Sequence, residues 1–140
     1  MLTNTEATIG GRVYTIGQLP ADVAFDVACI VAEWRGKQVA ALGDGALSPD
    51  ALIGAVPAAG RALTAIAKML RDPEYREKVW RPVLGVCSCD GVPVLRGDWA
   101  TTYAGDRLGD LYELHLKAVE HSCGGFLRAL GLGAAPAPKL

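Results

Sequence analysis

The sequence has no strong excess of charge of either sign and no long apolar run. Its 140 residues carry 14 Lys and Arg against 15 Asp and Glu, which gives a net charge of −1. Proteins that bind nucleic acid or anionic lipid ordinarily carry a basic excess, so this balance argues against both kinds of partner. No apolar segment reaches the roughly 18 residues that span a bilayer. The N-terminus lacks a basic segment followed by an apolar one, so we expect no signal peptide and a soluble, intracellular protein.

Residues that bind metals or act as nucleophiles are few. The sequence contains four cysteines and two histidines, namely Cys29, Cys87, Cys89, Cys123, His115 and His121. Zinc ligand pairs usually have two to four intervening residues, whereas Cys87 and Cys89 have one between them. His121 and Cys123 are also separated by one residue, and on a helix they would point about 200° apart. We therefore expect reduced thiols, with Cys29 in the core, and no metal, cofactor or enzymatic activity. A metal-binding module or enzyme that uses these cysteines is the alternative, and metal analysis of the pure protein would test it.

Apolar residues are what the sequence has in quantity. They make up 51% of the chain, against 21% charged residues. So high an apolar share in a small domain indicates that some apolar surface is kept for a partner or for self-association. The length suits one domain with its own core. We expect a single globular domain over residues 1–132, followed by a flexible Pro- and Ala-rich tail over residues 133–140.

Two β-hairpins are predicted from their turn residues. In the first, strand-forming residues flank Gly10-Gly11, and glycine accepts the positive φ angles that a tight hairpin turn requires. The second covers residues 83–95 and turns at Asp90-Gly91, a favoured pair for such turns. Pro93 has no backbone N–H, so its strand must lie at an edge of the sheet.

Helices account for most of the remaining chain, so the predicted fold class is α+β and mainly helical. Helix starts are expected where proline or a capping residue precedes an apolar stripe, and helix ends where glycine or proline follows it. The predicted helices are residues 20–36, a helix starting at Ser48-Pro49-Asp50, residues 58–70 after a kink or split at Pro57, a short helix from Asp72 that stops before Pro82, and a long amphipathic helix from Leu108 that Gly124-Gly125 interrupts. The expected core residues are Val27, Ile30, Val31, Trp34, Ile66, Leu70, Trp80, Leu111 and Leu114. His115 lies on the apolar stripe of the last helix, where we expect a hydrogen-bonded, half-buried ring.

Two segments, residues 9–34 and 98–131, carry motifs that occur together in one protein family. The first has a strand, a glycine turn, a strand with an aromatic residue, and Leu-Pro-Ala opening a helix. The second has aromatic residues near a glycine, a Gly-Asp-Leu-Tyr helix start, and a helix that ends in glycine and phenylalanine. Its matching residues are Trp99, Tyr103, Gly105, Gly109, Asp110, Leu111, Tyr112, Gly125 and Phe126. In both segments the chain resembles the tail assembly chaperones of long-tailed bacteriophages and prophages. It departs from the family pattern at His121-Ser122-Cys123, where an apolar residue, Asn and Phe are more usual.

The resemblance implies a non-catalytic protein that binds the aggregation-prone tape measure protein during tail assembly. It also implies that the protein acts in the host bacterial cytoplasm, is absent from the mature virion, and can have a longer frameshift product that binds the tail tube protein. The resemblance and the apolar stripe of the last helix together give the expected partner-binding residues, which are Tyr112, Val119, Phe126, Leu127 and Leu130. Self-association is expected as well, because a chaperone bound in many copies gains from avidity.

Other binding functions fit the same sequence. One is another phage structural or morphogenesis protein, such as a tail terminator or neck component, and another is a host-takeover binding protein. A structural component would assemble into closed rings, whereas a chaperone should stay monomeric or loosely associated until it meets its client.

Overall fold

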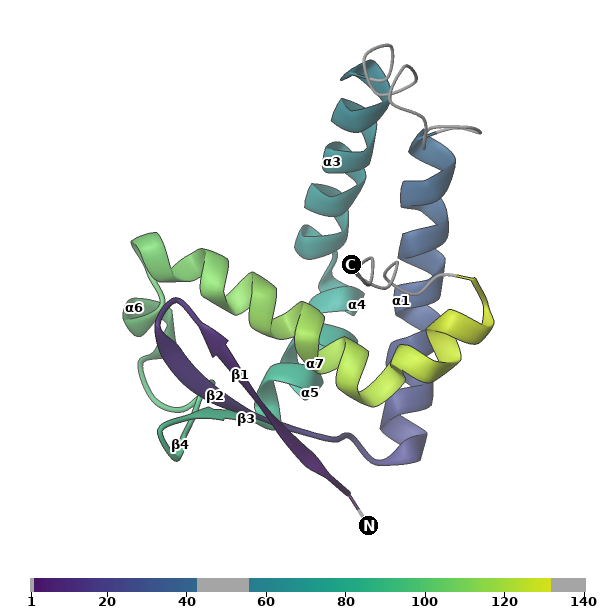
Figure 1. The fold of residues 1–140 in the computed structure, drawn as a ribbon. Helices are drawn as coiled ribbons and strands as arrows, with labels where there is room; N and C mark the ends of the chain where they lie inside the picture. The colour runs from purple at the N-terminus through teal and green to yellow at the C-terminus, as the bar shows by residue number, and fades with distance from the viewer. Residues whose placement is uncertain (1, 43–55, 132–140) are drawn as a thin grey trace, which may run out of the picture.

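The computed structural model describes residues 2–42 and 56–131, and its fold is α+β and mainly helical, as predicted (Figure 1). In chain order the elements are β1 (Asn4–Ile9), β2 (Arg12–Gly17), α1 (Ala21–Leu42), α3 (Val56–Arg71), α4 (Pro73–Tyr75), the π-helical turn η1 (Arg76–Trp80), α5 (Arg81–Gly85), β3 (Cys87–Cys89), β4 (Val92–Pro93), α6 (Trp99–Thr102), the 3-10 turn η2 (Gly105–Arg107) and α7 (Leu108–Ala129). The predicted helix start at Ser48-Pro49-Asp50 and the predicted tail over residues 133–140 lie outside the described residues.

The N-terminal hairpin forms as predicted, with β1 and β2 paired antiparallel along their whole length. Gly10 and Gly11 make its two-residue turn, with φ angles of +58° and +77°. L side chains rarely adopt these angles, which is why the turn needs glycine. Along β2 the side chains alternate, so that Tyr14 and Ile16 are buried while Val13 is exposed. The hairpin therefore has one face in the core.

The second hairpin adds two short strands to give a sheet of order β1-β2-β3-β4. Asp90 and Gly91 form its turn, with φ angles of +51° and +79°. Pro93 lies in β4 at the sheet edge, as its missing N–H predicts. The hairpin is shorter than predicted, because residues 83–85 belong to α5.

Helix α1 does not end at Gly36, as predicted, but continues to Leu42. A glycine inside a helix costs about 1 kcal/mol relative to alanine, and packing can offset that cost. Here α1 and α3 lie side by side and extend away from the sheet (Figure 1). Beyond Gly36, the Gln38 side chain lies 3.6 Å from the sulfur of Met69 on α3. The contact between the two helices thus extends α1 past its local stop signal.

The helical segment after α3 begins as predicted and ends later than predicted. Asp72 is its N-cap, and a carboxylate oxygen accepts a hydrogen bond of 2.9 Å from the Tyr75 N–H. Pro82 does not stop the helix, which continues through α5 to Gly85. The π-helical turn η1 directly precedes α5, and its wider hydrogen-bond spacing accommodates a residue without an N–H. Pro57 lies in the first turn of α3, where a missing N–H costs little.

Helix α7 crosses the sheet and packs against α1 and α5 (Figure 1). It is helical through Gly124-Gly125, so the predicted interruption there is wrong. In Figure 1 the helix instead changes direction in its last turns. At its start, Asp110 fits beneath the hairpin turn, where a Cβ on Gly10 would lie 2.5 Å from a carboxylate oxygen. The turn and the helix start therefore fix each other's positions.

The core lies between the sheet, α1, the segment from α4 to α5, and α7. Of the predicted core residues, Val27, Val31, Leu111 and Leu114 are buried. Ile30, Trp34, Leu70 and Trp80 are partly buried against this core, and Ile66 is half-buried. The largest buried apolar side chains that are absent from the predicted core are Ile9, Tyr14, Ile16, Tyr75, Val79, Val83, Leu84 and Leu127. Within residues 2–42 and 56–131, no helix has the length and apolar character needed to cross a membrane.

Candidate partner-binding surface

The C-terminal end of α7 carries large apolar side chains that the core does not cover. Phe126 is 40% exposed and Leu130, one turn further along, is 51% exposed. Phe25 on α1 is 59% exposed, and its ring centroid lies 5.6 Å from that of Phe126. Leu2, which precedes β1, is also exposed and lines the same groove between α1 and α7, on the side opposite Phe25 and Phe126. We call Leu2, Phe25, Phe126 and Leu130 the α7-end surface.

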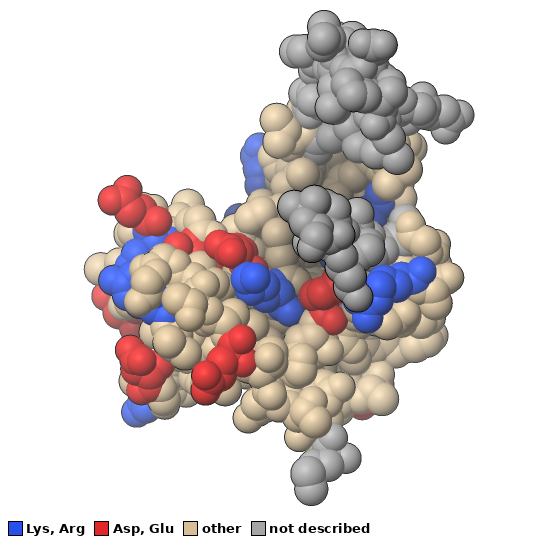
Figure 2. Space-filling model, viewed as in Figure 1, with Lys and Arg blue, Asp and Glu red and all other residues tan. Residues whose placement is uncertain are grey.

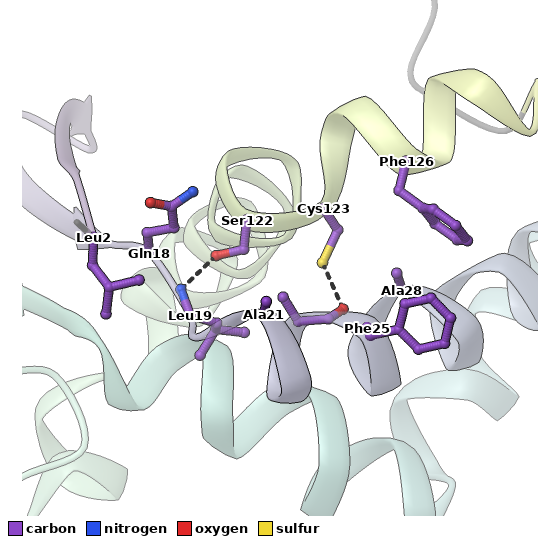
Figure 3. Close-up of a pocket in the computed structure, with 10 residues that line it drawn as sticks. Leu2, Gln18, Leu19, Ala21, Phe25, Ala28, Ser122, Cys123 and Phe126 are labelled. Carbon is purple, nitrogen blue, oxygen red and sulfur yellow. Dashed lines mark hydrogen bonds between the residues drawn. The ribbon is translucent and has the colours of Figure 1, made fainter.

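A groove of about 420 Å³ runs between the first turns of α1 and the end of α7 (Figure 3). Phe25 and Phe126 form one side of it, and Leu2 with Leu19 forms the other. Its floor consists of the small side chains Ala21, Ala24 and Ala28, which recur on one face of α1. Small residues at helical spacing allow another helix to approach closely.

Three polar contacts hold the end of α7 against the N-terminal part of the chain. The Ser122 hydroxyl accepts a hydrogen bond of 2.9 Å from the Leu19 N–H (Figure 3). The Cys123 thiol donates to the Ala24 carbonyl oxygen at 3.3 Å. Nε2 of His121 lies 3.0 Å from the Thr3 carbonyl oxygen, to which it donates. Burial raises the pKa of Cys123 to about 11, so this thiol stays protonated and remains a donor.

His121, Ser122 and Cys123 are the tripeptide that departs from the family pattern in the sequence. The structure gives each of them a contact with a different segment, so the three residues position the α7-end surface. The sequence gives no signal of this role, because their partners are backbone groups about 100 residues away.

The five predicted partner-binding residues lie in three different environments. Phe126 and Leu130 belong to the α7-end surface. Val119 and Leu127 are buried in the core, with exposed fractions of 1% and 0%. Tyr112 is half-buried and lies near the other end of α7. Phe25, in contrast, was missed, because it lies between Asp22 and Asp26, off the apolar stripe of its helix.

Tyr112 contributes to a second, larger groove of about 730 Å³ at the start of α7. We call it the Trp80–Trp99 groove after its two tryptophans, which are half-buried. Its apolar lining also includes Leu70, Leu95, Leu108, Leu111 and Tyr112. Arg76 and Arg81 are the charged residues of its lining. This groove therefore combines an apolar interior with a positive edge.

Charged side chains separate these surfaces along α7. On the face shown in Figure 2, blue and red side chains follow α7 and the hairpin end, whereas the area over the start of α1 is largely uncharged. Glu120 and Arg128 form an ion pair of 2.7 Å beside Gly124, and Glu113 and Lys117 form a longer one of 4.0 Å.

Buried His115 and Tyr75 are the pair most like a catalytic one, yet both are sealed in the core. The Tyr75 hydroxyl hydrogen-bonds Nε2 of His115, and Nδ1 of His115 lies 3.3 Å from the Tyr112 carbonyl oxygen. Burial lowers the pKa of His115 to about 4 and raises that of Tyr75 above its ordinary value. With His115 fully buried, no substrate reaches the ring. The prediction of a hydrogen-bonded ring is confirmed, and the ring is buried more deeply than predicted.

The cysteines lie apart from this pair. Cys87 is buried, and burial raises its pKa to about 12. Cys29, predicted to lie in the core, is instead exposed on α1, because it lies on the face of that helix opposite Val27 and Val31. Among the residues that the structure describes, no three His, Cys, Asp or Glu side chains come together as a metal site would require.

The two apolar grooves are the features among the described residues that suit the binding of another protein. A family model described as "Phage tail assembly chaperone protein, TAC" matches residues 10–134, which is most of the chain. The chain therefore belongs to the phage tail assembly chaperone family, and this family indicates a non-catalytic role in tail assembly. Neither a search of curated proteins nor a search of solved structures returns a match.

Proposed function

We propose that this chaperone binds helical segments of the tape measure protein on its α7-end surface and keeps them soluble during tail assembly. The observation that carries the proposal is the exposed pair of Phe25 and Phe126 beside a groove floored by alanines. An amphipathic helix binds such a groove through apolar side chains three or four residues apart. The tape measure protein is the long, helical client that the family resemblance implies.

Within this proposal the predicted residues have different roles. Phe126 and Leu130 contact the client, together with Phe25 and Leu2. Val119 and Leu127 support these side chains from the core, since both are buried. Tyr112 lies outside the α7-end surface, in the Trp80–Trp99 groove. Because one such surface is small, tight coating of a long client requires many copies acting together.

The place of action follows from the same proposal. The chaperone acts in the host cytoplasm, leaves before the tail is complete, and is absent from the virion. From the family resemblance we also propose a longer frameshift product that binds the tail tube protein. Mass spectrometry of infected cells and of purified virions tests these points, and a stoichiometric amount of the chain in virions would contradict them.

The experiment is co-expression with the tape measure protein encoded nearby, followed by affinity capture. We expect the natural chain to keep the client in the soluble fraction and to be captured with it in many copies. The double variant Phe126→Asp, Leu130→Asp should lose at least about tenfold in captured client, as expected for central contact residues. Leu63→Asp is the matched control, because Leu63 is an exposed leucine (67%) on α3, outside the groove.

Thermal unfolding of each variant separates binding from folding. The double variant should unfold within a few degrees of the natural chain, because both side chains are exposed. If it folds normally and captures the client as well as the natural chain does, the α7-end surface is not the client site. If the natural chain neither binds nor solubilises the client, the proposed function is wrong.

A further inference from the structure

The groove of about 420 Å³ between α1 and α7, which we call the α1–α7 groove, is apolar inside and acidic on one flank. Its described lining residues are all uncharged. Asp22 and Asp26 lie just outside the lining, on α1, and both are exposed. Neither forms an ion pair with another described residue. The first Lys or Arg of α1 is Arg35, about 14 Å further along the helix axis than Asp26. The two carboxylates therefore have no cation near them on their own helix.

Helical geometry places both aspartates beside Phe25 and away from the alanine floor of the groove. At 100° per residue, Asp22 and Asp26 point about 60° and 100° away from Phe25 around the α1 axis. Ala21 and Ala28 of the floor point to the other side of Phe25, by about 40° and 60° (Figure 3). The Phe25 ring thus separates the apolar floor from the two carboxylates.

The α7 flank of the groove contributes little net charge. Glu120 and Arg128 are the acidic and the basic residue among the last ten residues of α7. They form an ion pair of 2.7 Å with each other, so their charges largely cancel. A helix that binds in the groove therefore meets apolar side chains in the middle and negative charge on the α1 side.

A role in stabilising α1 accounts for only one of the aspartates. Asp22 lies in the first turn of α1, where a carboxylate interacts favourably with the positive end of the helix dipole. Asp26 lies beyond the first turn, where this interaction has fallen off. Its carboxylate remains available to a cationic side chain of a bound client.

We propose that the α1–α7 groove selects client helices that carry Lys or Arg beside their apolar stripe, and that Asp22 and Asp26 determine this preference. The inference rests on the proposed function, since it concerns the same groove. The alanines of the floor recur along the α1 axis, so a helix bound on them lies along α1. Asp22 and Asp26 are about 6 Å apart along that axis. Two cationic side chains three or four residues apart on the client match this spacing.

The test uses three synthetic helical peptides that share one stripe of Leu and Ala. The residues beside the stripe are Lys in the first peptide, Gln in the second and Glu in the third. At low salt we expect the natural chain to bind the Lys peptide about fivefold more tightly than the Gln peptide, and the Glu peptide least tightly. The factor is small because each exposed ion pair contributes little. High salt should bring the three affinities together, since it screens exposed charges.

Charge reversal assigns the preference to the two aspartates. The variant Asp22→Lys, Asp26→Lys should bind the Glu peptide more tightly than the Lys peptide. Asp26→Lys alone should abolish the preference, and it leaves the first turn of α1 unchanged. The matched control Asp98→Lys, Asp106→Lys changes the net charge equally, on exposed aspartates outside the groove lining, and should keep the natural order. Peptide affinities are measured well below the unfolding midpoint of each variant.

Two results would overturn this proposal and leave the proposed function standing. One is equal binding of the three peptides at low salt, because the groove would then bind apolar helices without regard to charge. The other is the same shift in preference in the reversal variant and in its control, because the net charge of the protein would then be the cause. Absence of binding by all three peptides would contradict both proposals.

The exposed Cys29 allows the same test on the tape measure protein itself. Cys29 lies one turn after Phe25, so a photoactivated cross-linker on its thiol marks the client segment beside Asp26. Cys89→Ser removes the other thiol that is not buried. We expect the cross-linked segments to carry two Lys or Arg three or four residues apart beside an apolar stripe. Segments with Asp or Glu in those places would overturn the proposal, whereas failure to capture any client would contradict the proposed function.

Discussion

The middle and the end of α7 belong to one continuous helix and one apolar stripe, yet they differ in what covers them. In the middle, Leu114, His115 and Val119 are buried under the sheet and the segment from α4 to α5. At the end, Leu127 is still part of the core, whereas Phe126 and Leu130 are exposed. An apolar stripe therefore shows which side of a helix packs against other apolar surfaces. Which members of the stripe the rest of the fold buries decides which ones remain available to a partner.

The distinction between buried and exposed residues of the apolar stripe is tested most strongly by truncating two adjacent side chains at the end of α7. Leu127 is 0% exposed and Phe126 is 40% exposed. We expect Leu127→Ala to lower the free energy of unfolding by about 2–5 kcal/mol, because it leaves a cavity in the core. Phe126→Ala should cost less than about 1 kcal/mol but should reduce client capture. Chemical denaturation and affinity capture measure the two effects.

Equal losses of stability in these two variants would contradict the distinction between core and surface. So would a loss of client capture by Leu127→Ala, measured well below its unfolding midpoint, as large as that of Phe126→Ala. The first result would mean that Phe126 is a core residue. The second would mean that the end of α7 binds the client through a rearranged surface.

The middle of α7 can be tested through the pH dependence of stability. Burial lowers the folded-state pKa of His115 to about 4, whereas an unfolded histidine titrates near 6.5. Between these values the unfolded chain binds a proton that the folded chain does not, so stability falls as pH falls. We expect a loss of about 2 kcal/mol between pH 7 and pH 5. Urea unfolding at the two pH values measures it.

The double variant His115→Leu, Tyr75→Phe is the control for this pH effect. It removes the titrating ring and also the hydroxyl that would otherwise lose its partner. Its stability should change much less between pH 7 and pH 5 than that of the natural chain. An unchanged pH dependence would show that another group is responsible, and that His115 can be protonated in the folded chain.

Much of the fold could be predicted because its signals are local. The positive φ angles of Gly10, Gly11 and Gly91 are built into their residue type. The cap at Asp72 is a contact between residues three apart. Such features depend on neighbours in the sequence, and all of them form where the sequence places them.

The missed features depend on contacts between distant segments. Gly36 and Pro82 are stop signals by residue type, but the α1–α3 contact and the π-helical turn override them. At the site, the exposure of Phe126 and Leu130 agrees with their predicted place at the surface, while Phe25 was missed. Its neighbours Asp22 and Asp26 mark an exposed face, and only the folded chain shows that this face lies beside Phe126.

The smallest expected effect tests how the end of α7 is held in its helical form. Nothing lies within 4 Å of a Cβ added at Gly125, whereas one at Gly124 would lie 2.6 Å from an oxygen of Glu120. Gly125→Ala should therefore stabilise the chain by about 0.5–1 kcal/mol, the helix preference of alanine over glycine. Gly124→Ala should gain less, because it must displace the side chains of the Glu120–Arg128 ion pair. Thermal unfolding in low and high salt separates the helix preference of alanine from the cost of displacing the ion pair. Salt weakens that ion pair, so high salt should narrow the difference in stability between the two variants. A Gly125→Ala variant that destabilises the chain would show that this glycine serves the bend at the end of α7, and that the α7-end surface depends on it.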